Sequence, residues 1–243
     1  RDPRGSVTMR SLALVIACAL AGCSTSPAPR EGAGPTRIVS LNPCSDAILA
    51  EVAPEKLVAV SAYSHDPSAS SMPVDVARRW PETGGSVEEI IAARADMVVA
   101  SSFLPAPTRN ALDRLGIPVV TLGMASDVDG NLAQVRELAD AVGEPEAGAA
   151  LVRRIETALE DAAPTEGTPQ PSTILWQPGG IVPGDGALVV DLMRRVGLQP
   201  AKATRGLGQG DRLPLEAVII DPPRNPSLIR AAKRLAQIRD GAL

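Results

Sequence analysis

The sequence predicts an α/β fold in which two lobes with parallel sheets enclose a cleft. Between residues 37 and 122, short apolar runs alternate with helical segments, a pattern typical of a parallel sheet covered by helices on both faces. Residues 84–101 read as a helix–strand unit, and the first half of this unit recurs more weakly at 212–219. A helical stretch of about 18 residues, long enough to span about 27 Å, separates the two halves.

The helix–strand unit at 84–101 is the most regular part of the sequence. Gly84 and Gly85 form a loop, and Ser86 followed by Glu89 has the spacing of a capping box at the start of a helix. The apolar run from Met97 to Ala100 fits a buried parallel strand. We expect one side of the short helix to be buried, through Ile90, Ile91 and Ala93.

The other elements follow from the same patterns. We expect strands at 37–41, 57–61, 117–122 and 173–177, and helices at 46–52, 106–115, 188–196 and 213–219. Two amphipathic stripes, through Leu132 and Leu151, predict a pair of helices broken at 143–145. Pro145 is compatible with the second helix if it lies in the first turn, and Gly197 is placed to end the helix at 188–196.

The chain divides into five segments. Residues 1–22 read as a signal peptide, 23–36 as a flexible tether, 37–126 as an N-terminal lobe, 127–163 as connecting helices and 164–243 as a C-terminal lobe. After Asp221, prolines and a basic segment at 227–239 replace the strand that the repeat predicts. The second lobe is therefore short by at least one strand, and a truncated or frameshifted C-terminus would account for this.

The N-terminal segment predicts export. Residues 12–20 form an apolar run too short to cross a membrane, and Leu20-Ala21-Gly22-Cys23 resembles a bacterial lipoprotein signal in which Cys23 is lipidated. An ordinary cleaved secretion signal is the alternative. Removing residues 1–22 leaves 21 basic and 27 acidic residues, a net charge of −6, which argues against nucleic-acid binding. With one histidine in 243 residues, a metal site built from several histidines is disfavoured.

The aromatic residues are few and lie outside the predicted core helices. Tyr63, Phe103 and Trp176 fall at or just after the C-terminal ends of predicted strands, and Trp80 precedes the unit at 84–101. Ligands of open α/β sheets bind at those strand ends. We interpret the aromatic residues as the lining of a pocket for a flat or bulky ligand; the alternative is that they anchor loops against the sheet.

Two further sets of residues each allow two interpretations. His65 and Cys44, or His65 and a serine, could form the nucleophilic site of a secreted hydrolase, although no nucleophile elbow is present. The alternative is that His65 is a surface or capping residue of its loop. Glu88 and Glu216 occupy matching positions in the two repeated units. They either complement the dipoles of their helices or form one acidic docking point per lobe.

Four parts of the sequence carry a resemblance to a known family: Arg37–Pro43, Leu57–Ser61 with Tyr63, the Gly-Ser-Val-Glu-Glu-Ile motif with its Ala-Asp-Met-Val-Val strand, and Asp191–Gly197. In these parts the chain resembles the solute-binding proteins of bacterial ABC importers for vitamin B12, ferric siderophores and haem. The resemblance covers residues 36–220. It implies two Rossmann-like lobes joined by a rigid helix, with the ligand between them. It also implies that Glu88 and Glu216 meet arginines of a permease.

The resemblance leads to a specific functional hypothesis. We expect a monomeric periplasmic receptor, held at the membrane by its lipid anchor, that captures cobalamin, a ferric siderophore or haem and delivers it to an ABC permease with its ATPase. No catalysis and no resident cofactor are expected; a degraded, non-binding remnant is the remaining alternative. The expected ligand-binding residues are Asn42, Pro43, Tyr63, Ser64, His65, Ser102, Phe103, Trp176, Gln177 and Gln209.

Overall fold

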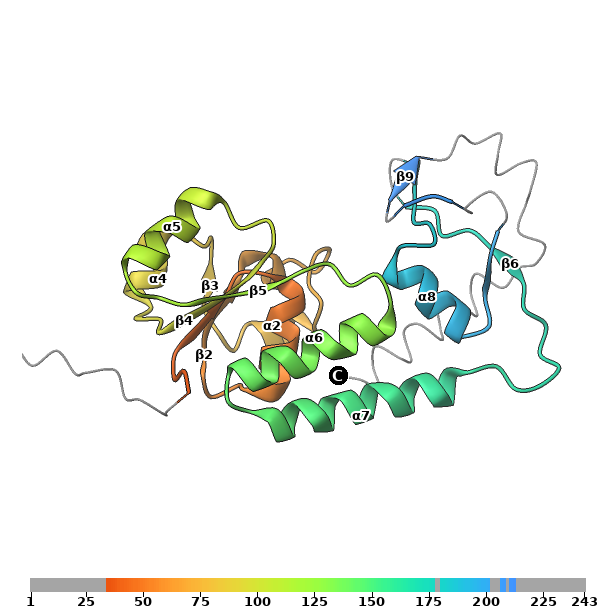
Figure 1. The fold of residues 1–243 in the computed structure, drawn as a ribbon, viewed down its shortest axis with the longest axis horizontal. Coiled ribbons are helices and arrows are strands. Elements are labelled where there is room, and N and C mark those ends of the chain that lie inside the picture. The colour runs from red at the N-terminus through yellow and green to blue at the C-terminus, as the bar shows by residue number, and fades with distance from the viewer. Residues whose placement is uncertain (1–33, 178–179, 202–205, 209, 213–243) are drawn as a thin grey trace, which may run out of the picture. The chain divides into compact units, whose positions relative to one another are not determined.

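A computed structural model describes residues 34–177, 180–201, 206–208 and 210–212. It shows an α/β fold, as predicted, built on a five-stranded parallel sheet with the order β3-β2-β1-β4-β5 (Figure 1). The strands of this sheet are β1 (Ile38–Ser40), β2 (Leu57–Ser61), β3 (Glu82–Thr83), β4 (Met97–Ser101) and β5 (Val119–Leu122). The helices between them are α2 (Pro43–Val52), the 3-10 helix η1 (Ala62–His65), α3 (Val74–Ala77), α4 (Val87–Ala92) and α5 (Ala106–Arg114).

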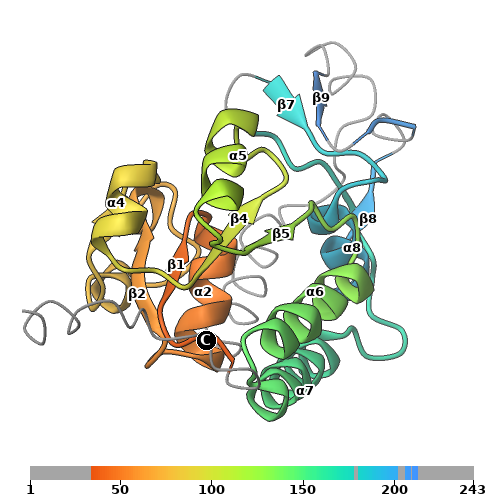
Figure 2. The ribbon, with the colours of Figure 1, turned by 60° about the vertical axis from the view of Figure 1, so that its left-hand side comes forward.

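The central strands β1, β2 and β4 are buried on both faces. Successive side chains of a strand point to opposite faces, so Ile38 joins one apolar cluster and Val39 joins the other. The first cluster lies against α2 and the long helices α6 (Val128–Ala141) and α7 (Pro145–Ala162). The second lies against α4 and α5 through Ile90 and Leu112 (Figure 2). This two-sided burial explains why the strands read as continuous apolar runs.

Local signals in the sequence fix the helix starts. The side chain of Asn42 accepts a hydrogen bond from the Cys44 backbone N at 2.8 Å, and Pro43 occupies the first turn of α2, where a missing N–H costs nothing. At α4, Ser86 and Glu89 form the predicted capping box. The prediction for Ile91 was wrong: its side chain is 50% exposed, because the six-residue helix buries only the stripe through Ile90.

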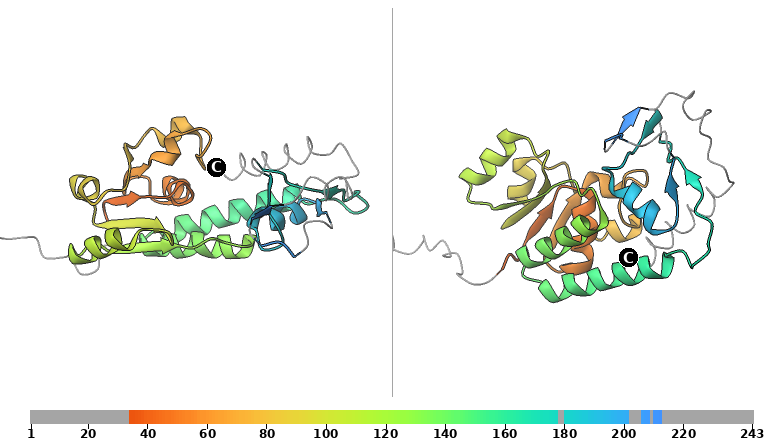
Figure 3. Two further views of the ribbon diagram at one scale, coloured as in Figure 1. Left: turned by 90° about the horizontal axis from the view of Figure 1, so that it is seen from above. Right: turned by 45° about the vertical axis from the view of Figure 1, so that its right-hand side comes forward.

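Helices α6 and α7 form an antiparallel pair that lies side by side in several views (Figures 1 and 3). Gly143, with φ +75°, makes the turn between them, and Pro145 lies in the first turn of α7, as predicted. The two helices approach most closely at Gly148. A Cβ atom added there would lie 2.3 Å from the Cβ of Ala139, so the helix pair requires a residue without a side chain at this position.

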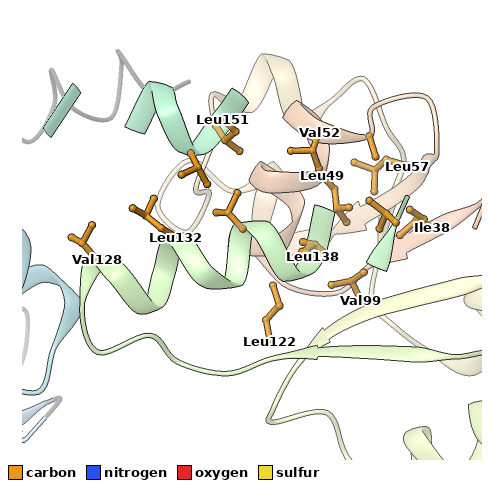
Figure 4. Close-up of a cluster of buried hydrophobic side chains, with 14 of the residues drawn as sticks. Ile38, Leu49, Val52, Leu57, Val99, Leu122, Val128, Leu132, Leu138 and Leu151 are labelled. Carbon is orange, nitrogen blue, oxygen red and sulfur yellow. The ribbon is translucent and has the colours of Figure 1, made fainter. Parts of the chain in front are cut away.

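One apolar cluster connects the sheet, the helix pair and the second half of the chain. Figure 4 shows its part in the sheet, α2 and the helix pair. It contains Ile38 of β1, Leu49 of α2 and Leu132 of α6, together with Met193 and Val196 at the end of helix α8 (Leu188–Arg195). The helix pair is therefore packed against both halves rather than standing free between them.

Charged side chains also connect α8 to α6. The Asp191 carboxylate accepts a hydrogen bond from the Val128 backbone N at 3.0 Å, and the Arg195 guanidinium donates to both Asp191 and Asp129. Partial burial tends to lower the pKa of Arg195, but the two carboxylates outweigh this effect and raise it. The start of α6 is thus held to α8 by a charged network. Asp191 and Arg195 are partly buried in it, and Asp129 is exposed.

The second half differs from the prediction in its strands. The strand expected at 173–177 is only β6 (Ser172–Thr173), which pairs in parallel with β8 (Gln199–Pro200). An antiparallel pair, β7 (Ile181–Val182) with β9 (Asp211–Arg212), was not predicted. Gly197 ends α8 with φ +81°, as predicted. The helix expected at 213–219 and the segment at 227–239 lie outside the described residues, and no described helix is long and apolar enough to cross a membrane.

A buried carboxylate attaches the segment after β2 to α2. The Asp46 side chain is fully buried, and its Oδ2 accepts hydrogen bonds from Ser61 N at 2.9 Å, Ser61 Oγ at 2.6 Å and Ser64 Oγ at 2.7 Å. Its Oδ1 has no hydrogen-bond partner in the described structure. Desolvation by burial raises the pKa of Asp46, and the serine hydrogen bonds lower it by less.

The close contact between α6 and α7 predicts that an added methyl group at Gly148 destabilises the protein, and that exchanging Gly148 and Ala139 restores the stability. Gly148→Ala should lower the free energy of unfolding by about 1–3 kcal/mol, because the added methyl overlaps the Ala139 side chain. In a helix without this contact, the same change would stabilise by about 1 kcal/mol. The measurement is urea unfolding followed by circular dichroism.

The double variant Ala139→Gly with Gly148→Ala is the control for this prediction. It returns the methyl group to the other helix and should recover stability to within about 1 kcal/mol of the wild type, since one glycine is kept in the helix pair. If Gly148→Ala alone is neutral or stabilising, the helices are not in tight contact at this point.

The raised pKa of Asp46 predicts a pH dependence of stability with a definite sign. Asp46→Asn keeps the shape of the side chain and removes its charge. Wild-type protein is stabilised by the protonated carboxyl at low pH, and this stabilisation is lost as pH rises through the folded-state pKa, which lies above 3.8. We therefore expect the stability of the variant relative to the wild type to increase with pH in chemical unfolding experiments.

Asp66→Asn is the matched control, because its shift has the opposite sign. Hydrogen bonds from the backbone and hydroxyl of Ser68 lower the pKa of Asp66. Relative to this variant, the wild type should therefore gain stability as pH rises from about 2 to 4. If the stability of Asp46→Asn and that of Asp66→Asn, each relative to the wild type, change in the same direction with pH, the raised pKa of Asp46 is contradicted.

Candidate functional site

The strand order places a crevice between β1 and β4. After β1 the chain passes to β2 on one side, whereas β4 lies on the other side of β1. The segments that follow β1 and β4 therefore diverge at the carboxyl edge of the sheet, where open α/β sheets bind ligands. A cavity of about 490 Å³ lies there, and we call it the switch-point pocket. Its lining residues are Asn42, Pro43, Cys44, Ile48, Ser101, Ser102, Phe103, Leu122, Gly123, Met124, Ala125, Asn131, Gln134, Gln177, Pro183, Ala187, Leu188 and Val189.

Backbone hydrogen bonds hold the segment after β4 in the pocket wall. The Ser102 backbone N donates to Leu122 O at 3.1 Å, which continues the β4–β5 ladder by one residue. The Phe103 backbone N lies 3.3 Å from Ser101 Oγ, to which it donates. These contacts leave the Phe103 side chain 73% exposed. A large aromatic ring this exposed, on a fixed backbone, is available to contact a ligand.

The segment after β5 forms another part of the wall, which was not predicted. The Gln134 side chain on α6 donates to Gly123 O at 3.0 Å, which holds residues 123–125 against the helix. Met124 follows and is 60% exposed. The rule that identified the aromatic residues, namely position just after a strand, applies equally to Met124. The predicted pocket residues are aromatic, polar or proline, and methionine was not considered among them.

The second half contributes Gln177, Pro183 and the start of α8. The backbone of Gln177 pairs with that of Ile181. Beyond it, Gly184 N donates to Gly208 O at 2.9 Å, and a Cβ on Gly184 would lie 2.1 Å from the Leu207 carbonyl oxygen. Glycine at 184 thus allows two loops to meet beside the pocket.

Five of the predicted ligand-binding residues line the pocket: Asn42, Pro43, Ser102, Phe103 and Gln177. Three others follow β2, which lies on the far side of β1 from β4, and do not line it. Of these, Tyr63 is 64% exposed, but Ser64 is fully buried and bonded to Asp46. Ser64 therefore holds the segment after β2 against α2, and its buried side chain does not face the pocket. Gln209, Glu216 and Cys23 lie outside the described residues.

His65 also has a role in the loop. Its Nε2 lies 3.1 Å from Trp80 O and 3.3 Å from Ala77 O, and its Nδ1 lies 3.3 Å from a Glu82 carboxylate oxygen. Cys44 is exposed in the pocket, and its Sγ lies 3.8 Å from Ser71 Oγ. Both ring nitrogens of His65 are therefore close to oxygen atoms, and no contact in the described structure pairs the ring with Cys44 as a nucleophilic dyad requires.

The two tryptophans differ in environment. Trp80 is half-buried against the core, and its Nε1 donates to Pro54 O at 3.3 Å, so the loop-anchor interpretation holds for this residue. Trp176 is 43% exposed and packs beside Gly180. It precedes the pocket residue Gln177 without lining the pocket itself. Its predicted contact with a ligand stays a prediction.

A second cavity and the metal-ligating side chains give no competing site. The second cavity, of about 480 Å³, lies between α2 and residues 67–76. Its one charged lining residue, Glu51, is paired with Arg154 at 3.0 Å. Within the described ranges, no group of three or more histidine, cysteine, aspartate or glutamate side chains could hold a metal ion.

Solved structures show the same fold. The periplasmic haem-binding protein RhuT from Roseiflexus sp. RS-1 is 23% identical, with a TM-score of 0.59 over 77% of this chain and 73% of that one. A periplasmic haem-binding protein from Pseudomonas aeruginosa is 21% identical, with a TM-score of 0.58 over 86% and 79%. A periplasmic binding protein from Veillonella parvula is 16% identical, with a TM-score of 0.63 over 79% and 69%.

At the level of sequence, no curated protein matches the chain significantly. The family model for periplasmic binding proteins, however, matches residues 38–238. This match spans the sheet, the helix pair and both walls of the switch-point pocket, and therefore the chain belongs to the periplasmic binding protein family.

Proposed function

We propose that this protein is the substrate-binding component of an ABC importer, which captures a metal chelate such as cobalamin or a ferric siderophore in the switch-point pocket and delivers it to a permease. The observation that carries the proposal is the pocket itself. It lies where the strand order reverses and is lined by residues of both halves of the chain. The haem-binding proteins with the same fold support a chelate as ligand.

The pocket offers contacts suited to a large, partly apolar ligand. Phe103 and Met124 expose apolar surface at its wall, and Leu122 and Leu188 extend that surface inside. Its volume falls within the range of about 300–1,000 Å³ for small-molecule sites. In this proposal the chelate brings its own metal ion, and the protein holds it by apolar contact and hydrogen bonds without ligating side chains.

Glu88 is the proposed docking point for the permease. It lies in the first turn of α4 and is exposed, whereas Glu89 beside it folds back onto the Ser86 backbone at 3.0 Å. Because α4 follows β3, Glu88 sits at the same carboxyl edge of the sheet as the pocket. Glu216 is proposed as its counterpart in the second half. Cys23 is the proposed lipid anchor that keeps the receptor at the membrane on the periplasmic side.

Phe103→Ala tests the ligand site. Calorimetric titration with cobalamin, ferric siderophores and haemin should identify a ligand of the wild type. The variant should bind this ligand about fivefold more weakly, because an aromatic contact contributes roughly 1 kcal/mol. Ile91→Ala, which removes an exposed apolar side chain on α4 that does not line the pocket, is the control and should leave affinity unchanged. Equal affinities for wild type and Phe103→Ala would place the ligand elsewhere.

Glu88→Gln tests the docking point. In proteoliposomes that contain the importer, this variant should reduce ligand-dependent ATP hydrolysis several-fold by losing one charged contact. Its affinity for the ligand and its stability should stay at wild-type values. Glu55→Gln is the matched control, since Glu55 is exposed in the turn before β2, at the opposite edge of the sheet. Equal effects of the two changes would exclude a specific role for Glu88.

A further inference from the structure

The switch-point pocket contains no charged side chain among its described lining residues. Its polar groups are the carboxamides of Asn42, Asn131, Gln134 and Gln177, the hydroxyls of Ser101 and Ser102, and the Cys44 thiol. The remaining lining residues are glycine, proline, alanine, leucine, isoleucine, valine, methionine and phenylalanine. No lysine, arginine, histidine, aspartate or glutamate is included.

The basic residues of the neighbouring helices are already paired. On α6, Arg136 contacts Glu156 at 3.3 Å. On α8, Arg194 pairs with Asp185, and Arg195 pairs with Asp129 and Asp191. On α2 there is no basic residue at all. On α5, which follows Phe103, Arg109 donates to Thr121 Oγ1 at 3.0 Å and does not line the pocket. The described helices α2, α6 and α8 therefore supply no unpaired cation to neutralise an anionic ligand.

The carboxamides, in contrast, retain unused hydrogen-bonding capacity. Asn42 uses only its Oδ1, to cap α2, and Gln134 uses only its Nε2, to hold Gly123. Asn131 and Gln177 make no side-chain hydrogen bond to another described residue. A carboxamide offers both a donor and an acceptor, so these groups match amide, carbonyl or hydroxamate groups at the edge of an uncharged ligand.

We infer that the pocket selects a metal chelate of zero net charge with amide or hydroxamate groups at its periphery. This inference rests on the proposed function and narrows it. An anionic chelate would leave its charge desolvated without a partner, which is costly. An uncharged one loses only hydrogen bonds to water, which the carboxamides replace. Corrinoids with amide side chains and ferric trihydroxamates share this chemistry; ferric tris-catecholates and the propionate-bearing haem do not.

The test compares ligands of different charge on the purified protein. Calorimetry is carried out with cyanocobalamin, an uncharged ferric trihydroxamate, a trianionic ferric tris-catecholate and haemin, each at low and at high salt. One of the two uncharged chelates should bind about a hundredfold or more tightly than either anionic one, with an affinity that does not change with salt. The chelate that binds, cyanocobalamin or the ferric trihydroxamate, shows whether the natural ligand is a corrinoid or a siderophore.

A charged substitution makes the test independent of ligand shape. Asn131→Lys places a cation in the wall of the pocket and should raise affinity for the trianionic complex at least tenfold while weakening that for the uncharged ligand. Asn110→Lys adds the same charge on the exposed face of α5, away from the pocket, and should change neither. Circular dichroism checks that both variants are folded.

The possible failures are distinguishable. Tight, salt-dependent binding of the tris-catecholate or of haemin by the wild type would overturn the inference and leave the proposed function standing. An Asn131→Lys variant with the same preference as the wild type would also overturn it. Absence of binding of all four chelates by the folded protein would overturn the proposed function as well.

Discussion

The reversal of strand order between β1 and β4 is the constraint on which the site depends. Parallel strands with right-handed crossovers must place their connections on both faces of the sheet. Where the chain changes from building on one side of β1 to building on the other, neighbouring connections diverge and leave a crevice. The segments after β1, β4 and β5 open into this crevice. The residues just after these strands are thereby exposed on a rigid scaffold.

The helix pair α6–α7 determines how the two walls of the pocket are held. Gly148 allows the helices to touch, and the same apolar cluster extends from β1 through α6 to the end of α8. The bonds of Asp191 and Arg195 to the start of α6 add a polar connection beside it. The side of the pocket formed by Gln177 and α8 is therefore fixed by packing, which supports small local adjustments over a wide hinge motion.

The sequence was sufficient to predict the elements whose signals are local. The capping box at Ser86 and the break at Gly143–Pro145 are set by neighbours in the chain, and both were predicted correctly. The pairing of β7 with β9 depends on contacts between residues about 30 positions apart, which no local pattern encodes. The strand at 173–177 was predicted from its apolar run, but only Ser172 and Thr173 pair with β8, and the apolar residues 174–176 lie outside the strand.

Position just after a strand identified candidate pocket residues. The order of the strands in the sheet decides which of these residues line the pocket. Phe103 follows β4 and lines the pocket, whereas Tyr63 follows β2 and does not. Nothing in either local sequence distinguishes them. The burial of Ser64 depends on Asp46, a partner 18 positions earlier. The carboxamide residues Asn42 and Gln177 were among the predicted pocket residues, and Met124 could have been, because it also follows a strand.

The apolar cluster shared by β1, α6, α7 and α8 also governs how the protein denatures. It contains Leu132 of α6 and Leu159 of α7 together with Met193 and Val196 of the second half. Neither half can separate without exposing apolar surface on the helix pair, and the free-energy cost of that exposure links their stabilities. We therefore expect the described fold to unfold as one cooperative unit and not as two independently melting lobes. A chain that lost the contacts of α8 would present the uncovered faces of α6 and α7 to other molecules, a condition that favours aggregation.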